Sequence, residues 1–416
     1  MNLTITPTRL HGTVTPPPSK SQAHRLLIAA ALAAGESVIE NVALSDDIRA
    51  TLRCMEALGA SWTLEGRVLR VRGVGGVTPL TSTGEELPRL DCGESGSTLR
   101  FLIPVALALA GGGVFTGRGR LMERPQQPYF DLFREKGIFY EQKDGVLTVR
   151  GRLTAGEYRL PGNVSSQFFT GLLFALPLLA EPSVIVPTTP LESAGYIAMT
   201  LQAMEEFGVA VPQTRSLPPH FLVPGGREYV SRRAAVEADW SQAAFWYAAQ
   251  VLGSGVTVAG MNEQSLQGDR AVLPYSRRIA VGGPVELDVS GCPDLAPPLA
   301  AMGALMDGEL RLTNAGRLRM KESDRLSAVT EALTAMGADV TEGPDSLTII
   351  GKPSLPGGCT VDCRNDHRIA MMAAVAAARC REPVTLLGAE CVSKSYPDFW
   401  EDYQTLGGII HEHSGK

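Results

Sequence analysis

The chain has 416 residues, of which 44% are hydrophobic and 20% charged, and its formal net charge is −6. This length exceeds a single ordinary core and favours two domains of about 200 residues, each able to bury most of its apolar surface. The negative charge disfavours nucleic acid as the main partner, because proteins that track phosphate backbones usually carry a basic stripe. An anion site in this chain therefore has to be local.

The sequence gives no indication of export or membrane insertion. The most apolar run, at 168–180, is too short to span a bilayer and contains Pro177. Seven cysteines without a Cys-x-x-Cys pair favour a reducing compartment. Cys359 and Cys363 are better explained as core or strand thiols than as a metal pair. We expect a monomeric cytoplasmic protein without a membrane partner.

The predicted elements, taken in chain order, repeat one pattern: small polar residues, an Ala/Leu-rich helix and a short β-branched strand. The six copies span residues 18–42, 93–117, 162–186, 237–260, 292–314 and 365–388. A second unit, an amphipathic helix ending in Gly and followed by strands, separates most copies; it lies at 46–66, 129–151, 197–211 and 325–343. The spacer before the fifth copy is shorter, so the repeat is imperfect.

The first helix of each copy is nearly all apolar, which predicts burial on every side, while its first turn carries polar residues. A helix start offers unpaired N–H groups and the positive end of the helix dipole. Several such starts facing one cleft would form an anion site without a basic protein surface.

Polar motifs stand at the helix starts of the first half. Ser19-Lys20-Ser21 with Arg25 combines hydroxyl, ammonium and guanidinium groups that suit phosphate, although a helix cap and a solvated charge explain them equally well. The Gly/Ser-rich turn at 93–100 lacks the Gly-Lys-Ser/Thr of a Walker loop. Arg124 lies in a polar loop. The third helix opens with two hydroxyls and an amide, Ser165, Ser166 and Gln167.

The second half adds carboxylates to these cations. Asp294 opens the fifth helix, and a dense charge cluster occupies 321–325, where a solvated face is the usual explanation of such a run. Eight cations recur at equivalent places of the repeat: Lys20, Arg25, Arg100, Arg124, Lys321, Arg325, Arg368 and Lys394. This mixture indicates a reaction on two anionic substrates, in which the cations bind phosphate and carboxylate and the carboxylates move protons.

Ten motifs follow one another along the chain. They are P-S-K-S-x-x-H-R at 18–25, S-D-D at 45–47, G-E-S-G-S-T-x-R at 93–100, E-R-P at 123–125, S-S-Q at 165–167, Q-G-D at 267–269, P-D at 293–294, K-E-S-D-R at 321–325, N-D-H-R at 365–368 and S-K-S-Y-P at 393–397. In this order the sequence resembles the enolpyruvyl transferases from end to end. Within that family it is most similar to the members whose acceptor is shikimate 3-phosphate.

The resemblance implies an α/β (α+β) fold, a two-lobed inside-out α/β barrel of six βαβαββ repeats, three in each lobe. One lobe would combine 1–18 with 238–416, and 19–237 would form the inserted lobe. The chain would cross between the lobes twice, forming a double-crossover hinge. The active site would lie in the cleft between the lobes.

The resemblance also implies roles for individual residues. Asp294 would be the base for the acceptor hydroxyl and Glu322 the acid, with Lys20, Lys321 and Lys394 as further catalytic residues. Shikimate 3-phosphate would contact Lys20, Ser21, Arg25, Ser165, Ser166, Gln167, Ser193, Tyr196, Asp294 and Lys321. Phosphoenolpyruvate would contact Lys20, Gly96, Arg124, Gln167, Arg325, Arg368 and Lys394. The reaction would be addition followed by elimination, without metal or cofactor.

Some positions depart from the family pattern. Glu94 and Arg317 stand where many members have Asn, and Pro298 is expected to kink the fifth helix. The main alternative is a transferase whose acceptor is UDP-N-acetylglucosamine. That enzyme carries Asn at the position of Ser21 and a Cys in the loop 117–125, where this chain has none. A non-catalytic bilobed anion-binding protein is the second alternative, and it predicts loss of the catalytic residues.

Overall fold

The computed structural model describes residues 1–75 and 86–413 and shows a mixed α/β fold. The chain divides into two compact units. The discontinuous unit comprises Met1–Pro17 and Ala238–Lys416, and the inserted unit comprises Pro18–Glu237. Pro18 therefore falls with the inserted unit, whereas we expected it in the other one. Among the described helices, none is long and apolar enough to cross a membrane.

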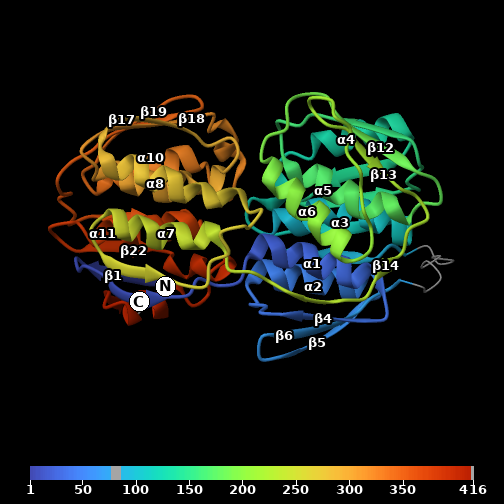
Figure 1. Ribbon diagram of the computed structural model, residues 1–416, viewed down its shortest axis with the longest axis horizontal. Coiled ribbons are helices and arrows are strands. Elements are labelled where there is room, and N and C mark those ends of the chain that lie inside the picture. The colour runs from blue at the N-terminus through green and yellow to red at the C-terminus, as the bar shows by residue number, and fades with distance from the viewer. Residues whose placement is uncertain (76–85, 414–416) are drawn as a thin grey trace. The chain divides into compact units, whose positions relative to one another are not determined.

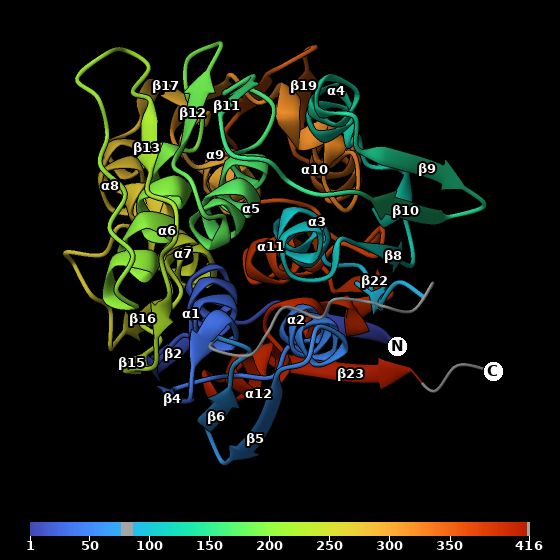
Figure 2. The same ribbon diagram turned by 90° about the vertical axis from the view of Figure 1, so that its right-hand side faces the viewer.

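The described α-helices of the inserted unit are α1 (Lys20–Leu32), α2 (Asp46–Ala57), α3 (Gly96–Ala110), α4 (Gln127–Lys136), α5 (Ser166–Ala175) and α6 (Ala194–Glu206). All of them except α4 pack on one another in a closed ring. The ring runs α1, α2, α3, α5, α6 and back to α1, and Figure 2 shows these helices nearly end-on. From Ala23 onward every residue of α1 is buried, and α3 and α5 are nearly as enclosed. The predicted burial of the apolar helices is thus confirmed.

Sheets flank this ring of helices. Their strands are β3 (Ala33–Ala34), β4 (Glu36–Glu40), β5 (Ser61–Glu65), β6 (Val68–Arg72), β7 (Arg89–Asp91), β8 (Gly112–Thr116), β9 (Phe139–Lys143), β10 (Val146–Arg150), β11 (Glu157–Leu160), β12 (Ser183–Pro187), β13 (Phe221–Val223), β14 (Tyr229–Val230) and β15 (Arg233–Ala235). The orders are β15-β4-β6-β5, β7-β8-β10-β9, β11-β12-β13 and β14-β3. In the second sheet β7 and β8 are parallel while β9 and β10 form an antiparallel hairpin, which gives the order βαβαββ. The first sheet takes its outer strand β15 from the far end of the unit.

The discontinuous unit repeats this arrangement. Its helices are α7 (Trp240–Val251), α8 (Val272–Val281), α9 (Ala296–Ala304), α10 (Arg325–Ala335), α11 (His367–Ala377) and α12 (Phe399–Thr405). Helices α7, α9 and α11 pack against one another, and every residue of α11 is buried. Helix α7 also packs against α8, and α11 packs against α10, and Figure 1 shows these four helices running in roughly the same direction.

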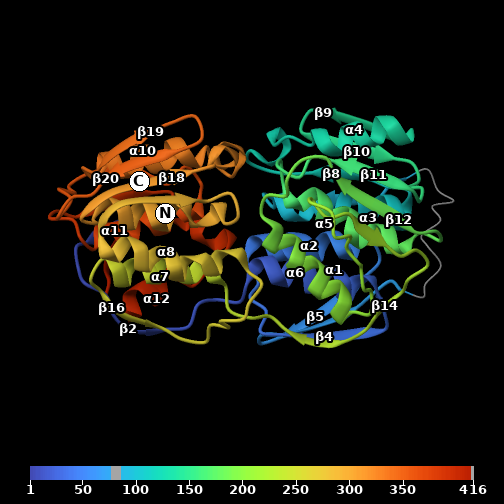
Figure 3. The same ribbon diagram turned by 45° about the horizontal axis from the view of Figure 1, so that its top comes forward.

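The described part of the discontinuous unit contains three sheets. Their strands are β1 (Asn2–Thr6), β2 (His11–Val14), β16 (Gly255–Val258), β17 (Gly283–Asp288), β18 (Gly308–Thr313), β19 (Asp339–Glu342), β20 (Leu347–Ile350), β21 (Thr360–Asp362), β22 (Val384–Leu387) and β23 (Ile409–His413). The orders are β16-β2, β17-β18-β20-β19 and β21-β22-β1-β23. The sheet that contains β18, β19 and β20 lies over α10 (Figure 3).

The fourth repeat does not have the expected βαβαββ order. In the described structure its sheet consists of the parallel pair β16 and β2, without a hairpin. The reason is chain length, because α8 ends at Val281 and the next repeat begins with β17 at Gly283. No residues remain there for two further strands.

The prolines of α9 and α3 have different consequences for their helices. Pro298 lies in the first turn of α9, where a backbone N–H has no partner within the helix, so it removes no helix hydrogen bond. The kink that we expected at Pro298 is therefore not required. Pro104, in contrast, lies inside α3 and cannot donate to the carbonyl of Arg100 four residues earlier. That carbonyl accepts instead from the Tyr129 hydroxyl at 2.7 Å.

Candidate active site

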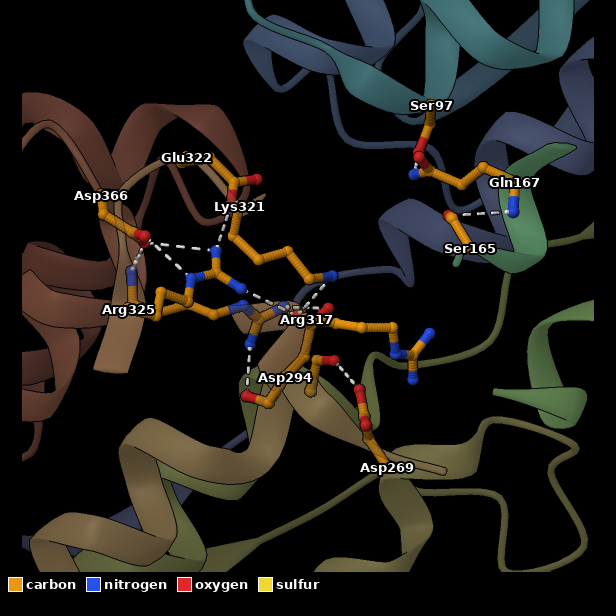
Figure 4. Close-up of polar contacts among 12 residues, drawn as sticks. Ser97, Ser165, Gln167, Asp269, Asp294, Arg317, Lys321, Glu322, Arg325 and Asp366 are labelled. Carbon is orange, nitrogen blue, oxygen red and sulfur yellow. Dashed lines mark hydrogen bonds and ion pairs between the residues drawn. The ribbon is translucent and has the colours of Figure 1, made fainter. Parts of the chain in front are cut away.

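The carboxylate of Asp294 is surrounded by cations within the discontinuous unit. Asp294 lies in a short 3-10 turn, Pro293–Leu295, directly before α9. Its carboxylate lies 2.8 Å from Arg325, 3.2 Å from Arg368 and 3.3 Å from Lys321 (Figure 4). The side chain is 17% exposed, so solvent and ligands still reach it. Residues from three segments that are distant in sequence thus meet at the starts of three helices.

These contacts govern the protonation of Asp294. Burial alone would raise its pKa, but Arg368, Lys321 and Arg325 outweigh burial and hold the pKa of this carboxyl well below its ordinary value. Asp294 is therefore ionised in the unliganded protein. A carboxylate in this state is a weak base until an anionic ligand draws the cations away.

Arg325 is the centre of the cluster. Its guanidinium is 1% exposed and reaches three carboxylates: Asp294, Glu322 at 2.5 Å and Asp366 at 2.8 Å. Burial alone would lower its pKa, but Asp366, Glu322 and Asp294 together raise it. Asp366 also caps α11 and accepts from the Ser323 hydroxyl at 2.9 Å. The residue predicted as base and the residue predicted as acid therefore share one arginine.

Three further residues of this unit flank the cluster. Lys394 ends the 3-10 turn Ala389–Lys394 and donates to the carbonyl of Asn365 at 2.6 Å, next to the start of α11. Arg317 donates to the carbonyl of Ser290 at 2.5 Å. Asp269 accepts from a serine hydroxyl, and burial, with the nearby charge of Asp294, raises its pKa to about 6.

In the inserted unit, the first helix start holds Lys20 and Arg25. Lys20 pairs with Asp47, at the start of α2, at 2.8 Å. Arg25 is buried and donates to the carbonyl of Ser21 at 2.6 Å and to that of Tyr196 at 3.2 Å. Its guanidinium lies 5.8 Å from the centre of the Tyr196 ring, and burial lowers its pKa to about 10. Predicted contacts of the phosphorylated acceptor, from α1 and α6, thus meet in one place.

A second group of this unit centres on Gln167, at the start of α5. Its amide oxygen accepts from Arg100 at 2.8 Å, and its amide nitrogen donates to the Ser97 hydroxyl at 3.0 Å (Figure 4). The Arg124 guanidinium lies directly over Gly96, because a Cβ atom built on Gly96 would stand 2.5 Å from it. Glycine is therefore required for this approach.

The serines predicted as acceptor contacts have different local roles. Ser165 caps α5 by accepting from the backbone N–H of Gln167 at 3.3 Å. Ser166 is the first residue of that helix and is buried. Ser193 precedes α6 in a left-handed conformation, with φ 55°, and is also buried. The capping that we considered for the small polar residues is thus present at Ser165.

The structure also brings in residues to which sequence reasoning assigned no role. Asp47 pairs with Lys20, Asp366 holds Arg325, and Ser97 and Gln126 contact Gln167 and Arg100. Asp47 lies in the S-D-D motif and Asp366 in the N-D-H-R motif. Their places in these motifs were the one sequence feature that could have indicated a role for them. Within residues 1–75 and 86–413, no group of three or more His, Cys, Asp or Glu is arranged to hold a metal ion.

The sequence matches a family model described as EPSP synthase (3-phosphoshikimate 1-carboxyvinyltransferase) over residues 5–403. The chain belongs to the EPSP synthase family. It is 44% identical to the 3-phosphoshikimate 1-carboxyvinyltransferases of Clostridium kluyveri and Clostridium beijerinckii, over 99% of this chain and 99% and 98% of theirs.

Solved structures share the fold of this EPSP synthase family member. An EPSP synthase from Acinetobacter baumannii matches with a TM-score of 0.80 at 24% identity, over 99% of this chain and all of that one. The enolpyruvyl transferase NikO from Streptomyces tendae matches with a TM-score of 0.76 at 16% identity, over 100% of this chain and 99% of that one. Membership of the EPSP synthase family makes the chain an enzyme of the shikimate pathway, a transferase, as the motifs predicted.

Proposed function

We propose that the chain transfers the enolpyruvyl group of phosphoenolpyruvate to the 5-hydroxyl of shikimate 3-phosphate, giving 5-enolpyruvylshikimate 3-phosphate and inorganic phosphate. The observation that carries this proposal is the cluster around Arg325. One buried arginine holds two carboxylates, Asp294 and Glu322, at the edge of a group of cations. Such a group can bind an anionic substrate and move protons at the same centre.

The first chemical step is addition. Glu322 donates a proton to the methylene carbon C3 of phosphoenolpyruvate, which makes C2 cationic. The 5-hydroxyl oxygen attacks C2 while Asp294 accepts the hydroxyl proton, and a tetrahedral phosphate ketal forms. Lys321, which is 3.3 Å from Asp294, and Lys394 assist by stabilising the charge that develops.

The second step is elimination. The C–O bond to phosphate breaks, and a proton leaves the methyl carbon C3, which regenerates the enol ether. Lysines and arginines around the leaving phosphate stabilise its charge. Glu322 accepts the proton that leaves C3, and Asp294 gives its proton to the leaving phosphate, so both carboxyl groups return to their starting states.

Substrate binding also accounts for how Asp294 becomes a base. In the unliganded protein its pKa is held low by Arg368, Lys321 and Arg325. Arg325 and Arg368 are proposed contacts of phosphoenolpyruvate, whose carboxylate and phosphate compete with Asp294 for the same guanidinium groups. The arriving anion then raises the pKa of Asp294, and the base becomes effective only when substrate is present.

The residues of the inserted unit serve the same reaction in this proposal. Shikimate 3-phosphate contacts Lys20, Ser21, Arg25, Ser165, Ser166, Gln167, Ser193, Tyr196, Asp294 and Lys321. Phosphoenolpyruvate contacts Lys20, Gly96, Arg124, Gln167, Arg325, Arg368 and Lys394. We further propose the two-lobed inside-out barrel of the family, in which a double-crossover hinge lets the two sets of helix starts close around both ligands. Closure excludes water from the cationic intermediate.

The test is phosphate release from phosphoenolpyruvate by the purified protein, measured without added metal. Shikimate 3-phosphate and UDP-N-acetylglucosamine are supplied as acceptors in parallel reactions. We expect release only with shikimate 3-phosphate. Release only with the sugar nucleotide would keep the mechanism and overturn the acceptor, and no release with either would favour a binding protein.

A further inference from the structure

Helices α1 and α2 are joined near their N-terminal ends by two polar contacts, one helical turn apart. In the outer contact, Lys20 Nζ lies 2.8 Å from Asp47 Oδ2, and the two side chains are 15% and 11% exposed. In the inner contact, His24 Nδ1 lies 2.7 Å from Thr51 Oγ1, and both residues are fully buried. Each helix contributes residues four apart, which lie on one face of a helix.

The inner contact continues to a third helix. Thr51 Oγ1 lies 2.7 Å from Thr98 Oγ1, and Thr98 donates to the Ser95 hydroxyl at 2.7 Å. Ser95 is the N-cap of α3, whose first residue is Gly96. One buried chain of hydrogen bonds thus connects the first turns of α1, α2 and α3, which carry Lys20, Asp47 and Gly96.

The direction of these hydrogen bonds assigns the proton on His24. A hydroxyl group has one hydrogen, and that of Thr98 points to Ser95. Thr51 then donates to Thr98 at 2.7 Å or to the carbonyl of Asp47 at 3.4 Å, and in both cases His24 must donate to Thr51 from Nδ1. Burial, together with the charges of Lys20 and Arg25, lowers the pKa of His24 well below its ordinary value. His24 is therefore neutral, with its proton on Nδ1.

We propose that His24 is a positioning residue for Lys20, because it fixes the first turn of α1 against α2 and α3 through Thr51 and Thr98. With the helix fixed, the Lys20 side chain can leave Asp47 for an anionic substrate by rotation of its own bonds alone. This inference rests on the proposed function, in which Lys20 contacts both substrates. It gives a role to the histidine of the P-S-K-S-x-x-H-R motif, which the proposed reaction leaves without one.

Loss of this positioning should affect turnover more than substrate binding. Attraction between an ammonium and an anion decreases slowly with distance, so a small displacement of Lys20 changes binding little. Stabilisation of a transition state requires correct placement, and a shift of about 1 Å can lower a rate 100-fold. We therefore expect kcat to fall while KM for phosphoenolpyruvate changes much less.

Variants at His24 and Thr51 separate positioning from simple packing. The amide of His24→Asn places a polar group at the position of Nδ1, whereas that of His24→Gln places it near Nε2. Thr51→Val keeps the shape of the side chain without its hydroxyl, and Thr51→Ser keeps the hydroxyl. Thr330→Val is the matched control, because the Thr330 hydroxyl donates to the carbonyl of Leu326 in its own helix.

We expect His24→Gln and Thr51→Val to lower kcat about 10- to 100-fold. KM for phosphoenolpyruvate should change less than about fivefold. His24→Asn, Thr51→Ser and Thr330→Val should keep kcat within about threefold of the parent. The double variant His24→Gln/Thr51→Val should be no slower than the slower of the two single variants, because both changes break the same chain of hydrogen bonds. Thr51→Val carries the test if His24→Gln does not fold.

The result that overturns the proposal is a kcat within twofold of the parent for both His24→Gln and Thr51→Val, or equal losses for His24→Asn and His24→Gln. Failure of the unmodified protein to release phosphate would contradict the proposed function instead. The positioning of Lys20 is then judged from its ¹⁵Nζ resonance. His24→Gln should shift this resonance and His24→Asn should leave it unchanged; no shift with either variant also overturns the proposal.

Discussion

Asp294 illustrates how one residue can serve binding and catalysis in turn. Its carboxylate neutralises part of the charge of Arg325, Arg368 and Lys321 in the unliganded protein. Removing that negative charge leaves the cations available to an anionic ligand. The same change removes the group that accepts the hydroxyl proton.

We predict that Asp294→Asn binds phosphoenolpyruvate at least as tightly as the parent but turns over about 100-fold or more slowly. Calorimetric titration gives the affinity, and phosphate release gives the rate. Asp339→Asn, a change at an exposed position of β19 in the same unit, is the control and should leave both unchanged. Turnover of Asp294→Asn within threefold of the parent would remove Asp294 from the role of base.

The raised pKa of Asp269 predicts that stability falls as the pH rises. An ordinary paired carboxylate, whose pKa is lowered by folding, has the opposite effect. Burial raises the pKa of Asp269 from 3.8 to about 6. Below about pH 4 the carboxyl is protonated in both the folded and the unfolded chain, so its ionisation does not change the free energy of unfolding. Between about pH 4 and 6 the unfolded chain ionises first, so stability falls as the pH rises. The difference corresponds to about 3 kcal/mol at neutral pH.

Asp269→Asn should therefore raise the thermal midpoint at pH 7 by several degrees and change it little at pH 4. The measurement is the unfolding temperature of parent and variant in matched buffers at both pH values. An equal change at the two pH values would show that the effect is one of packing rather than of charge.

Part of the arrangement of the site residues was predictable from motifs, and part of it was not. The placing of Asp294, Lys321, Glu322, Arg325 and Arg368 in one group follows from equivalent positions in a repeat. Two further carboxylates that pair with predicted site cations in the unliganded protein were not assigned, because a salt bridge between segments that are distant in sequence leaves no periodic signal. Asp366 with Arg325 and Asp47 with Lys20 are such pairs.

At the scale of single elements, α3 depends on a side chain from outside the helix. Pro104 leaves the carbonyl of Arg100 without its helical donor, and Tyr129 supplies a hydroxyl in its place at 2.7 Å. The same hydroxyl lies 3.1 Å from the carbonyl of Phe168, in α5. At Gly171 a Cβ would stand 2.3 Å from the Tyr129 oxygen, so this residue has to be glycine.

We predict that Tyr129→Phe lowers the free energy of unfolding by about 1–3 kcal/mol, because it leaves a buried carbonyl unsatisfied. Pro104→Ala restores the N–H that this carbonyl lacks. The double variant Tyr129→Phe/Pro104→Ala should therefore recover most of the loss, as measured by urea unfolding. Losses that simply add would contradict this account.

Sequence patterns predicted elements better than their pairing. Apolar helices and Gly-terminated amphipathic helices were recognised because their periodicities are local. The pairing of β15 with β4 was not recognised, because nearly the whole sequence of the inserted unit separates these two strands. The missing hairpin of the fourth repeat was indicated only by its short spacer.

At the scale of the whole molecule, the inserted unit begins and ends at neighbouring residues. Ser19 N donates to the carbonyl of Glu237 at 2.8 Å, and on the other side Asp239 N donates to the carbonyl of Pro17 at 2.9 Å. Where the chain passes from one unit to the other, each of these hydrogen bonds therefore joins two residues of the same unit. Termini that lie close together are typical of domains that fold independently.

We predict that residues 18–237 fold when produced alone. Residues 1–17 joined to 238–416 by a short Gly/Ser linker should fold as well. Dispersed amide signals in NMR spectra and a cooperative thermal transition are the expected outcomes for both proteins. A molten spectrum for either one would show that its core requires the other unit.

The position of β1 in the middle of its sheet has a consequence for synthesis on the ribosome. This strand pairs with β22 and β23, which lie at the opposite end of the sequence. At about 5–20 residues per second, the N-terminal strand waits roughly 20–80 s for its partners. The inserted unit, in contrast, is complete as soon as residue 237 has emerged. Nascent chains should therefore acquire their structure from the middle of the sequence outward, with the first residues made among the last to be ordered.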